Sequence, residues 1–76
     1  MITVKLYGLL RIESGIKEKQ LSAATVQEVL DYMESCEIPR KALKTCVILV
    51  NGNSAGKRTI LNNGDTVVLM SPVAGG

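Results

Sequence analysis

Apolar and more polar residues alternate along residues 2–7 of the chain. Ile2, Val4 and Leu6 fall on one side of an extended backbone, and the residues between them fall on the other. Because successive side chains of a β-strand point to opposite faces, this pattern predicts a strand with one buried face. Residues 16–21 alternate in the same way but are rich in charge, which predicts a short strand at a sheet edge, where lysines discourage unwanted pairing.

The apolar spacing becomes helical over residues 25–38. Four apolar residues there follow the i, i+3, i+4, i+7 rule and predict one buried stripe: Val26, Val29, Leu30 and Met33. Thr25 is the expected N-cap, and Glu28 three positions later completes a capping box. The helix is expected to end before Pro39, because the residue preceding a proline avoids the helical region.

Shorter segments connect these elements. Residues 9–14 are expected to form a single helical turn that ends at Gly15 in the left-handed conformation. The pairs Asn51-Gly52 and Asn63-Gly64 are turn signals, and Asp65 is expected to accept hydrogen bonds from nearby backbone N–H groups. Residues 39–44 are interpreted as a connection, and residues 53–58 as a loop.

Two runs near the end, residues 47–50 and 67–70, are apolar at every position. Such runs are typical of strands covered on both faces, as in the centre of a sheet. The expected order is therefore strand, strand, helix, strand, strand. The helix supplies the crossover that a parallel pair of first and last strands requires. This predicts the α+β fold class: a β-grasp (ubiquitin-like) mixed sheet with one main helix across one face.

Composition narrows the functions that such a domain supports. The chain has 76 residues and a net charge of +2, with two tyrosines as its only aromatic residues. The weak charge and the missing stacking platforms argue against nucleic-acid binding. No apolar run approaches the length that spans a bilayer, and there is no signal peptide, so we expect a cytoplasmic protein with no membrane partner.

Candidate catalytic groups are scarce. The chain has no histidine and two cysteines, Cys36 and Cys46, which do not form a metal-binding pattern, so no metal site and no catalytic residue is expected. We expect both cysteines to be reduced and buried, although neither a disulfide nor a reactive thiol is ruled out by the pattern. The segment around Gly56-Lys57 resembles a phosphate loop only loosely, because its spacing is one residue short and no helix follows.

A loose group of basic residues is the remaining charged feature of the chain. It consists of Arg40, Lys41, Lys44, Lys57 and Arg58. A solvated face is the simpler interpretation, and an acidic protein partner is the functional alternative.

The last six residues differ from the rest of the chain. Residues 1–70 form the predicted domain, and residues 71–76 form a predicted flexible, extended tail that ends in Gly75-Gly76. Pro72 removes a backbone donor and restricts both its own backbone and that of Ser71. Glycine at the tip lets the backbone enter a narrow channel, so we expect the tail to deliver its terminal carboxylate into another protein's active site.

Three motifs in the C-terminal third give the chain a family resemblance. They are VNG at 50–52, LNNGDTV at 61–67 and PVAGG at 72–76. Together with the element order, they resemble the ubiquitin-like sulfur carriers, and most of all the small subunit of molybdopterin synthase. The chain departs from that subunit's usual pattern in having Ser71 where a second proline is common, and in lacking phenylalanine.

The resemblance implies a carrier and not an enzyme, with catalysis in its partners and no cofactor bound to the chain itself. An activating enzyme of the ubiquitin-activating type would use ATP to adenylate Gly76. A sulfurtransferase or another sulfur donor would then convert Gly76 into a thiocarboxylate. The tail would be inserted into the large subunit of molybdopterin synthase or an equivalent acceptor enzyme, where the sulfur is donated. Pro72, Val73 and Ala74 would line the entry channel, and Gly75 would permit close backbone approach.

Other functions remain open at this stage. The same fold and tail are expected of a thiamine-type or other sulfur carrier. They are also expected of a ubiquitin-like modifier that is conjugated through Gly76. A plain interaction module, in which the glycine tail has no role, is a further alternative.

Overall fold

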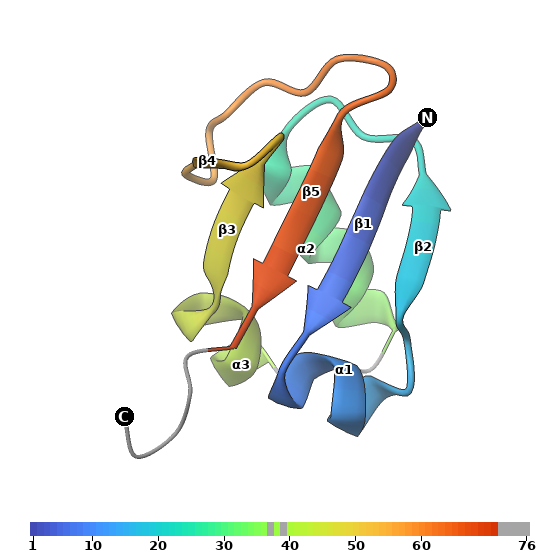
Figure 1. The fold of residues 1–76 in the computed structure, drawn as a ribbon, viewed down its shortest axis with the longest axis vertical. Coiled ribbons are helices and arrows are strands. Elements are labelled where there is room, and N and C mark those ends of the chain that lie inside the picture. The colour runs from blue at the N-terminus through green and yellow to red at the C-terminus, as the bar shows by residue number, and fades with distance from the viewer. Residues whose placement is uncertain (37, 39, 72–76) are drawn as a thin grey trace.

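The computed structural model of the chain describes residues 1–36, 38 and 40–71. A sheet runs through the molecule, and helix α2 lies behind it (Figure 1). In chain order the elements are β1 (Ile2–Tyr7), α1 (Leu9–Ser14), β2 (Glu18–Leu21), α2 (Val26–Ser35), α3 (Arg40–Thr45), β3 (Val47–Val50), β4 (Asn53–Ser54) and β5 (Thr66–Met70).

The five strands form one mixed sheet in the order β2-β1-β5-β3-β4. β1 and β5 pair in parallel, from Thr3 opposite Thr66 to Tyr7 opposite Met70. The other neighbouring pairs are antiparallel. The first and last strands are therefore central parallel neighbours, and β2 is an edge strand, as the sequence predicts. The β-grasp architecture is confirmed.

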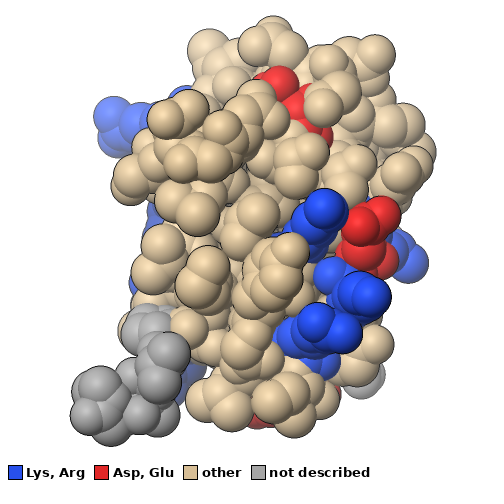
Figure 2. Space-filling view, in the orientation of Figure 1, with Lys and Arg blue, Asp and Glu red and all other residues tan. Residues whose placement is uncertain are grey.

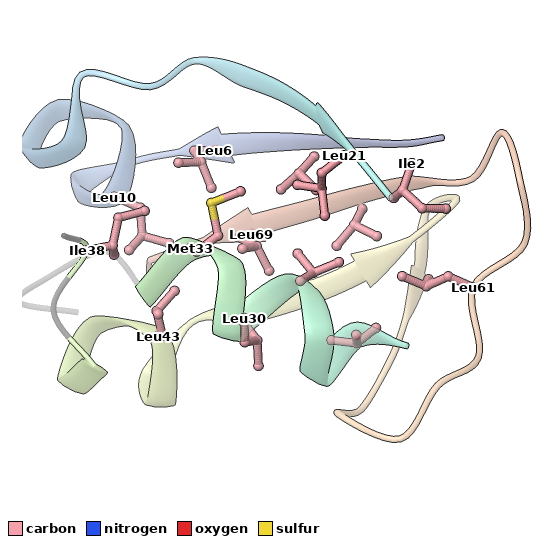
Figure 3. Packing of buried hydrophobic residues seen from close by; sticks show 14 residues of the cluster. Ile2, Leu6, Leu10, Leu21, Leu30, Met33, Ile38, Leu43, Leu61 and Leu69 are labelled. Atoms are coloured by element: carbon pink, nitrogen blue, oxygen red, sulfur yellow. The ribbon is translucent and has the colours of Figure 1, made fainter. Parts of the chain in front are cut away.

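The core fills the space between the sheet and α2. Val4, Val67 and Leu69 on the strands are fully buried. On α2 the four residues of the predicted stripe are buried as well. Figure 3 shows Leu6 and Leu69 of the sheet beside Met33 of the helix. Because both layers contribute aliphatic side chains to one cluster, the helix and the sheet stabilise each other.

Helix α2 begins as its sequence predicts. Thr25 Oγ1 accepts a hydrogen bond from the Glu28 amide at 3.3 Å. Glu28 Oε1 in turn accepts one from the Ala24 amide, also at 3.3 Å. These bonds satisfy backbone donors that the first helical turn leaves without intrahelical partners. The expected short helix α1 is also confirmed, and it ends at Gly15 with φ 73°.

Two elements were missed in the sequence. Residues 40–45 form helix α3, because Arg, Lys, Ala and Leu are good helix formers and Leu43 is buried in the core. Residues 53–54 form the short strand β4. Asn51 and Gly52 both have positive φ, at 51° and 84°, and this turn folds β4 back onto β3.

The expectation that residues 47–50 and 67–70 are covered on both faces is wrong. In β5 buried residues alternate with partly exposed ones, and β3 has no fully buried residue. The main helix α2 covers one side of the sheet and lies behind it in Figure 1. The second face of these strands is therefore apolar and open. None of the helices in the described ranges is long and apolar enough to cross a membrane.

Candidate functional site

The predicted sulfur-carrying tail lies outside the residues that the structure describes. This applies to Pro72, Val73, Ala74, Gly75 and Gly76. Their attachment point is described: β5 ends at Met70, and Ser71 follows it. Ser71 is buried, and its Oγ accepts a hydrogen bond from the Leu9 amide at 2.7 Å. The tail therefore starts from a fixed point on the body.

Next to this point, exposed apolar side chains lie in a row across three strands. Met70 is opposite Tyr7 on one side and opposite Val47 on the other. Their side chains are 36%, 40% and 45% exposed, respectively. Val68 and Leu49 form the next row of the same face and are partly exposed. We call these five residues the open-face patch.

Basic residues border the open-face patch on the side of β1 and β2. A shallow hollow of about 70 Å³ is lined there by Lys5, Leu6, Tyr7, Arg11, Lys17 and Glu18. Figure 2 shows several blue Lys and Arg side chains, with some red, gathered on this side, while most of the surface over β3 and β5 is tan. A surface that is apolar at its centre and basic at one border fits a protein partner with an apolar centre and an acidic rim.

The predicted basic group is only partly brought together. Arg40, Lys44 and Lys57 line a hollow of about 200 Å³ beside α2 and α3, but Asp31 and Glu34 line it as well. Arg40 donates to Glu34 at 2.7 Å, and this hydrogen bond and the charge of Glu34 raise the pKa of Arg40. Because acids and bases are mixed in this hollow, it favours the interpretation as a solvated face over that of an anion site.

Cys46 does not have the environment of an activated thiol. Cys36 and Cys46 are both free and partly buried. Cys46 Sγ donates to the Leu43 carbonyl at 3.1 Å, and burial raises the pKa of this thiol. A raised pKa lowers the fraction of nucleophilic thiolate. Within the described ranges, no group of three His, Cys, Asp or Glu residues is positioned to hold a metal ion.

Comparison with known proteins identifies the family. The profile of the ThiS family matches residues 4–76, which is nearly the whole chain. The chain belongs to the ThiS family. It is thus a small ubiquitin-like protein of the sulfur-carrier and modifier type, and the resemblance found in the sequence is confirmed. No curated protein sequence matches this ThiS-family chain.

Solved structures agree with this family assignment. A chain in the BexX/CysO complex of Amycolatopsis orientalis is 28% identical, with all of both chains covered and a TM-score of 0.79. The small archaeal modifier protein 1 of Methanosarcina acetivorans is 27% identical, with 99% of this chain and 95% of that chain covered and a TM-score of 0.80.

A third structure shares the fold at lower identity. It is a chain in the complex of subunits 1 and 2 of the molybdopterin-converting factor from Helicobacter pylori. This chain is 24% identical, with 99% of the ThiS-family chain and 97% of that chain covered and a TM-score of 0.76. Two of the three relatives are therefore seen in complexes with another protein.

The open-face patch was not found by sequence reasoning, although a signal for it exists. The runs at 47–50 and 67–70 are apolar at every position, and we interpreted this as burial on both faces. A small domain with one main helix has too little chain to cover both faces of a sheet. The surplus apolar positions in these runs indicated an exposed apolar surface.

Proposed function

We propose that this ThiS-family chain is a sulfur carrier that works through its last residue, Gly76. An activating enzyme of the ubiquitin-activating type would adenylate the Gly76 carboxylate with ATP. A sulfurtransferase or another sulfur donor would then convert it into a thiocarboxylate. The observation that carries the proposal is the family match, which runs through the Pro72–Gly76 motif to the last residue of the chain.

The chemistry explains why the chain needs partners. A free carboxylate is a poor acyl donor, because its negative charge repels nucleophiles and it offers no good leaving group. Adenylation supplies the leaving group, and attack by sulfur releases AMP and leaves the C–S bond of the thiocarboxylate. That sulfur carries the negative charge at neutral pH and is a nucleophile. The work of the carrier is to present it, and the catalytic groups belong to the partners.

The body of the domain supports this role by its open-face patch. Met70 belongs to the patch and lies directly before Ser71, where the tail starts. A partner that covers Met70, Tyr7 and Val47 would hold the domain while the tail enters its active site. Exposed apolar groups of this kind mark protein interaction sites, and the basic border adds electrostatic attraction to an acidic rim.

We further propose that the acceptor is the large subunit of molybdopterin synthase, which would receive the sulfur for a pterin. Support comes from the sequence motifs at residues 50–52, 61–67 and 72–76 and from the shared fold with the molybdopterin-converting factor complex. A second function, protein modification through Gly76, is favoured by the 27% identity to a small archaeal modifier protein. Both functions would begin with the same acyl-adenylate at Gly76. They differ in the group that is transferred: a carrier gives up its sulfur and regains a free carboxylate, whereas a modifier transfers its Gly76 acyl group to an amine and forms an isopeptide bond.

Intact-mass spectrometry tests the carrier step. The chain is incubated with ATP, the activating enzyme and a sulfide source, and we expect the mass gain of one oxygen-to-sulfur exchange on Gly76. Deletion of Gly75-Gly76 should abolish this gain and leave the fold intact. Gly56→Ala is the matched control, because a side chain there meets no atom within 4 Å.

Two results bear on the proposal and its alternative. A wild-type chain that gains no sulfur, or a shortened chain that still does, would contradict the carrier function. Conjugates of a tagged chain with cellular proteins that disappear when Gly76 is removed would support the modifier function. If the tail had no role, removing it would leave partner binding unchanged.

A further inference from the structure

The root of the tail contains a contact between residues that lie 62 positions apart. Ser71 is the buried polar side chain of the described residues, with 9% of its surface exposed. Its Oγ is 2.7 Å from the amide nitrogen of Leu9, the first residue of α1. A hydroxyl at the C-terminal end of the sheet thus accepts a hydrogen bond from the start of a helix near the N-terminus.

Helix α1 has no side-chain cap of its own. The residue in its N-cap position is Gly8, which has no side chain to accept a hydrogen bond from the first amides. The first amides of a helix lack intrahelical partners, and a serine oxygen is one of the preferred acceptors for them. In this molecule the acceptor comes from Ser71, so the cap of α1 also fixes the end of β5.

Gly8 is required for this contact to form. Its backbone has φ 68° and ψ −143°, a conformation that residues with a side chain rarely adopt. A Cβ atom at Gly8 would lie 2.5 Å from Ser71 Oγ, which is too close for any real contact. The glycine therefore provides both the backbone conformation and the space that the serine hydroxyl occupies.

The contact extends the sheet by one fixed residue. The parallel ladder of β1 and β5 ends with Tyr7 opposite Met70. The hydrogen bond between Ser71 and Leu9 continues the connection beyond that pair. Only five residues follow Ser71. A fully extended chain advances about 3.4 Å per residue, so the position of Ser71 confines Gly76 to within about 17 Å.

We propose that Ser71 and Gly8 form a tail anchor, and that Ser71 is thereby a positioning residue for the chemistry at Gly76. The inference rests on the proposed carrier function. Without the hydroxyl, Ser71 loses its hydrogen bond to the Leu9 amide, and Met70 becomes the last residue that is held to the sheet. The segment between this residue and Gly76 is then one residue longer. The acyl group then samples a larger volume and is less often aligned with ATP in the activating enzyme. Poor alignment of reacting groups lowers the rate of the chemical step.

Steady-state kinetics of Gly76 adenylation, followed by ATP–pyrophosphate exchange with the activating enzyme, test the anchor. Ser71→Ala should lower kcat about tenfold. It should leave KM within about twofold, because the open-face patch that holds the body is unchanged. Thr25→Ala is the matched control, because it also removes a hydroxyl cap, from α2, far along the chain from the tail.

Both variants lose one cap, so their Tm values should fall by a similar amount, roughly 4–8 °C. If the role of Ser71 is purely structural, Ser71→Ala and Thr25→Ala should have equal kcat values at a temperature where both are folded. That result would overturn the proposed anchor. Ser71→Thr retains the hydroxyl and should restore kcat. If Ser71→Thr keeps the Leu9 amide protected from hydrogen exchange but does not restore kcat, the proposal is also contradicted.

A failure of the carrier function gives a different result. In that case the wild-type chain itself shows no exchange of pyrophosphate. The proposed anchor is then tested by measuring the residual dipolar couplings of Val73 and Ala74. These couplings should change in Ser71→Ala and stay as in wild type in Thr25→Ala. Unchanged couplings in both variants would overturn the anchor without any reference to activity.

Discussion

The two faces of the sheet both carry apolar residues along β3 and β5 but differ in what covers them. On the face toward α2, Val4, Val67 and Leu69 are completely buried. On the other face, Met70 of β5 and Val47 of the neighbouring β3 keep 36% and 45% of their surface exposed. Both faces of β5 carry apolar residues, and the helix layer on one side makes the difference in burial.

This comparison separates stability from recognition. Apolar residues on the covered face contribute the burial that holds the fold together. Apolar residues on the open face gain little from folding, because water still reaches them. They are suited to gain that burial when a partner covers them. Substitutions on the covered face should therefore mainly lower the free energy of unfolding, and substitutions on the open face should mainly weaken partner binding.

The largest effect on stability is expected on the covered face. Met33→Ala in α2 removes a fully buried side chain and leaves a cavity between the helix and the sheet. The free energy of unfolding should fall by about 2–5 kcal/mol. Urea denaturation measures this loss. A loss smaller than about 2 kcal/mol would mean that the helix and the sheet move together and fill the cavity.

An open-face substitution should show the opposite profile. Val47→Glu places a charge at the β3 side of the open-face patch and opposes an acidic partner rim. Affinity for the activating enzyme should fall at least about tenfold, while the free energy of unfolding changes by less than about 1 kcal/mol. Titration calorimetry and urea denaturation give the two numbers. Unchanged affinity would exclude Val47 from the docking surface.

The turn before β5 offers a test that depends on neither face. The Asn62 amide donates to Asp65 at 2.8 Å and the Asn51 side chain donates at 3.0 Å, and these bonds hold the pKa of Asp65 below its ordinary value of 3.8. A lowered folded-state pKa adds stability that is complete above the ordinary value. That stability is lost as the pH falls through the lowered pKa.

Asp65→Asn should therefore reduce the dependence of Tm on pH between about pH 5 and about pH 2. Thermal denaturation followed by circular dichroism over this range checks the prediction. Asp31→Asn is a suitable control, because Asp31 lies on the exposed side of α2 and accepts a hydrogen bond only from a neighbouring side chain, Gln27. Equal slopes for wild type and Asp65→Asn would show that these bonds do not stabilise the carboxylate.

The smallest effect is expected on the outer surface of the helix layer. Arg40 pairs with Glu34, and both side chains are largely exposed, at 70% and 41%. Exposed ion pairs contribute little because water and salt screen them. Arg40→Ala should leave both Tm and partner affinity unchanged within error. A clear loss of affinity would mean that this surface takes part in docking as well.

The sequence predicted most of the covered layer. Apolar residues repeat with the helical period along α2 and alternate with polar residues along β1. Each repeat marks a single buried side, so local spacing was sufficient to assign Val29 and Val4 to the core. Thr25 and Glu28 marked the start of α2 for the same reason, because a cap is a local feature. The parallel pairing of β1 with β5 followed from the order of elements and the crossover helix.

The features that were missed depend on contacts between distant segments. The open face of β3 and β5 is determined by the absence of a second covering layer within the described residues, and a run such as 47–50 carries no information about that. The contact between Ser71 and Leu9 joins the two ends of the chain. No local pattern predicts it.

The position of β5 between β1 and β3 has a mechanical consequence. A force applied to the C-terminal end of β5 acts along the length of this strand. The backbone hydrogen bonds to both neighbouring strands, β1 and β3, then bear the force together in shear. They do not open one after another as they would at a frayed edge. A pull on the proposed tail would therefore be resisted by the sheet as a whole, which would suit repeated insertion into a partner and withdrawal from it.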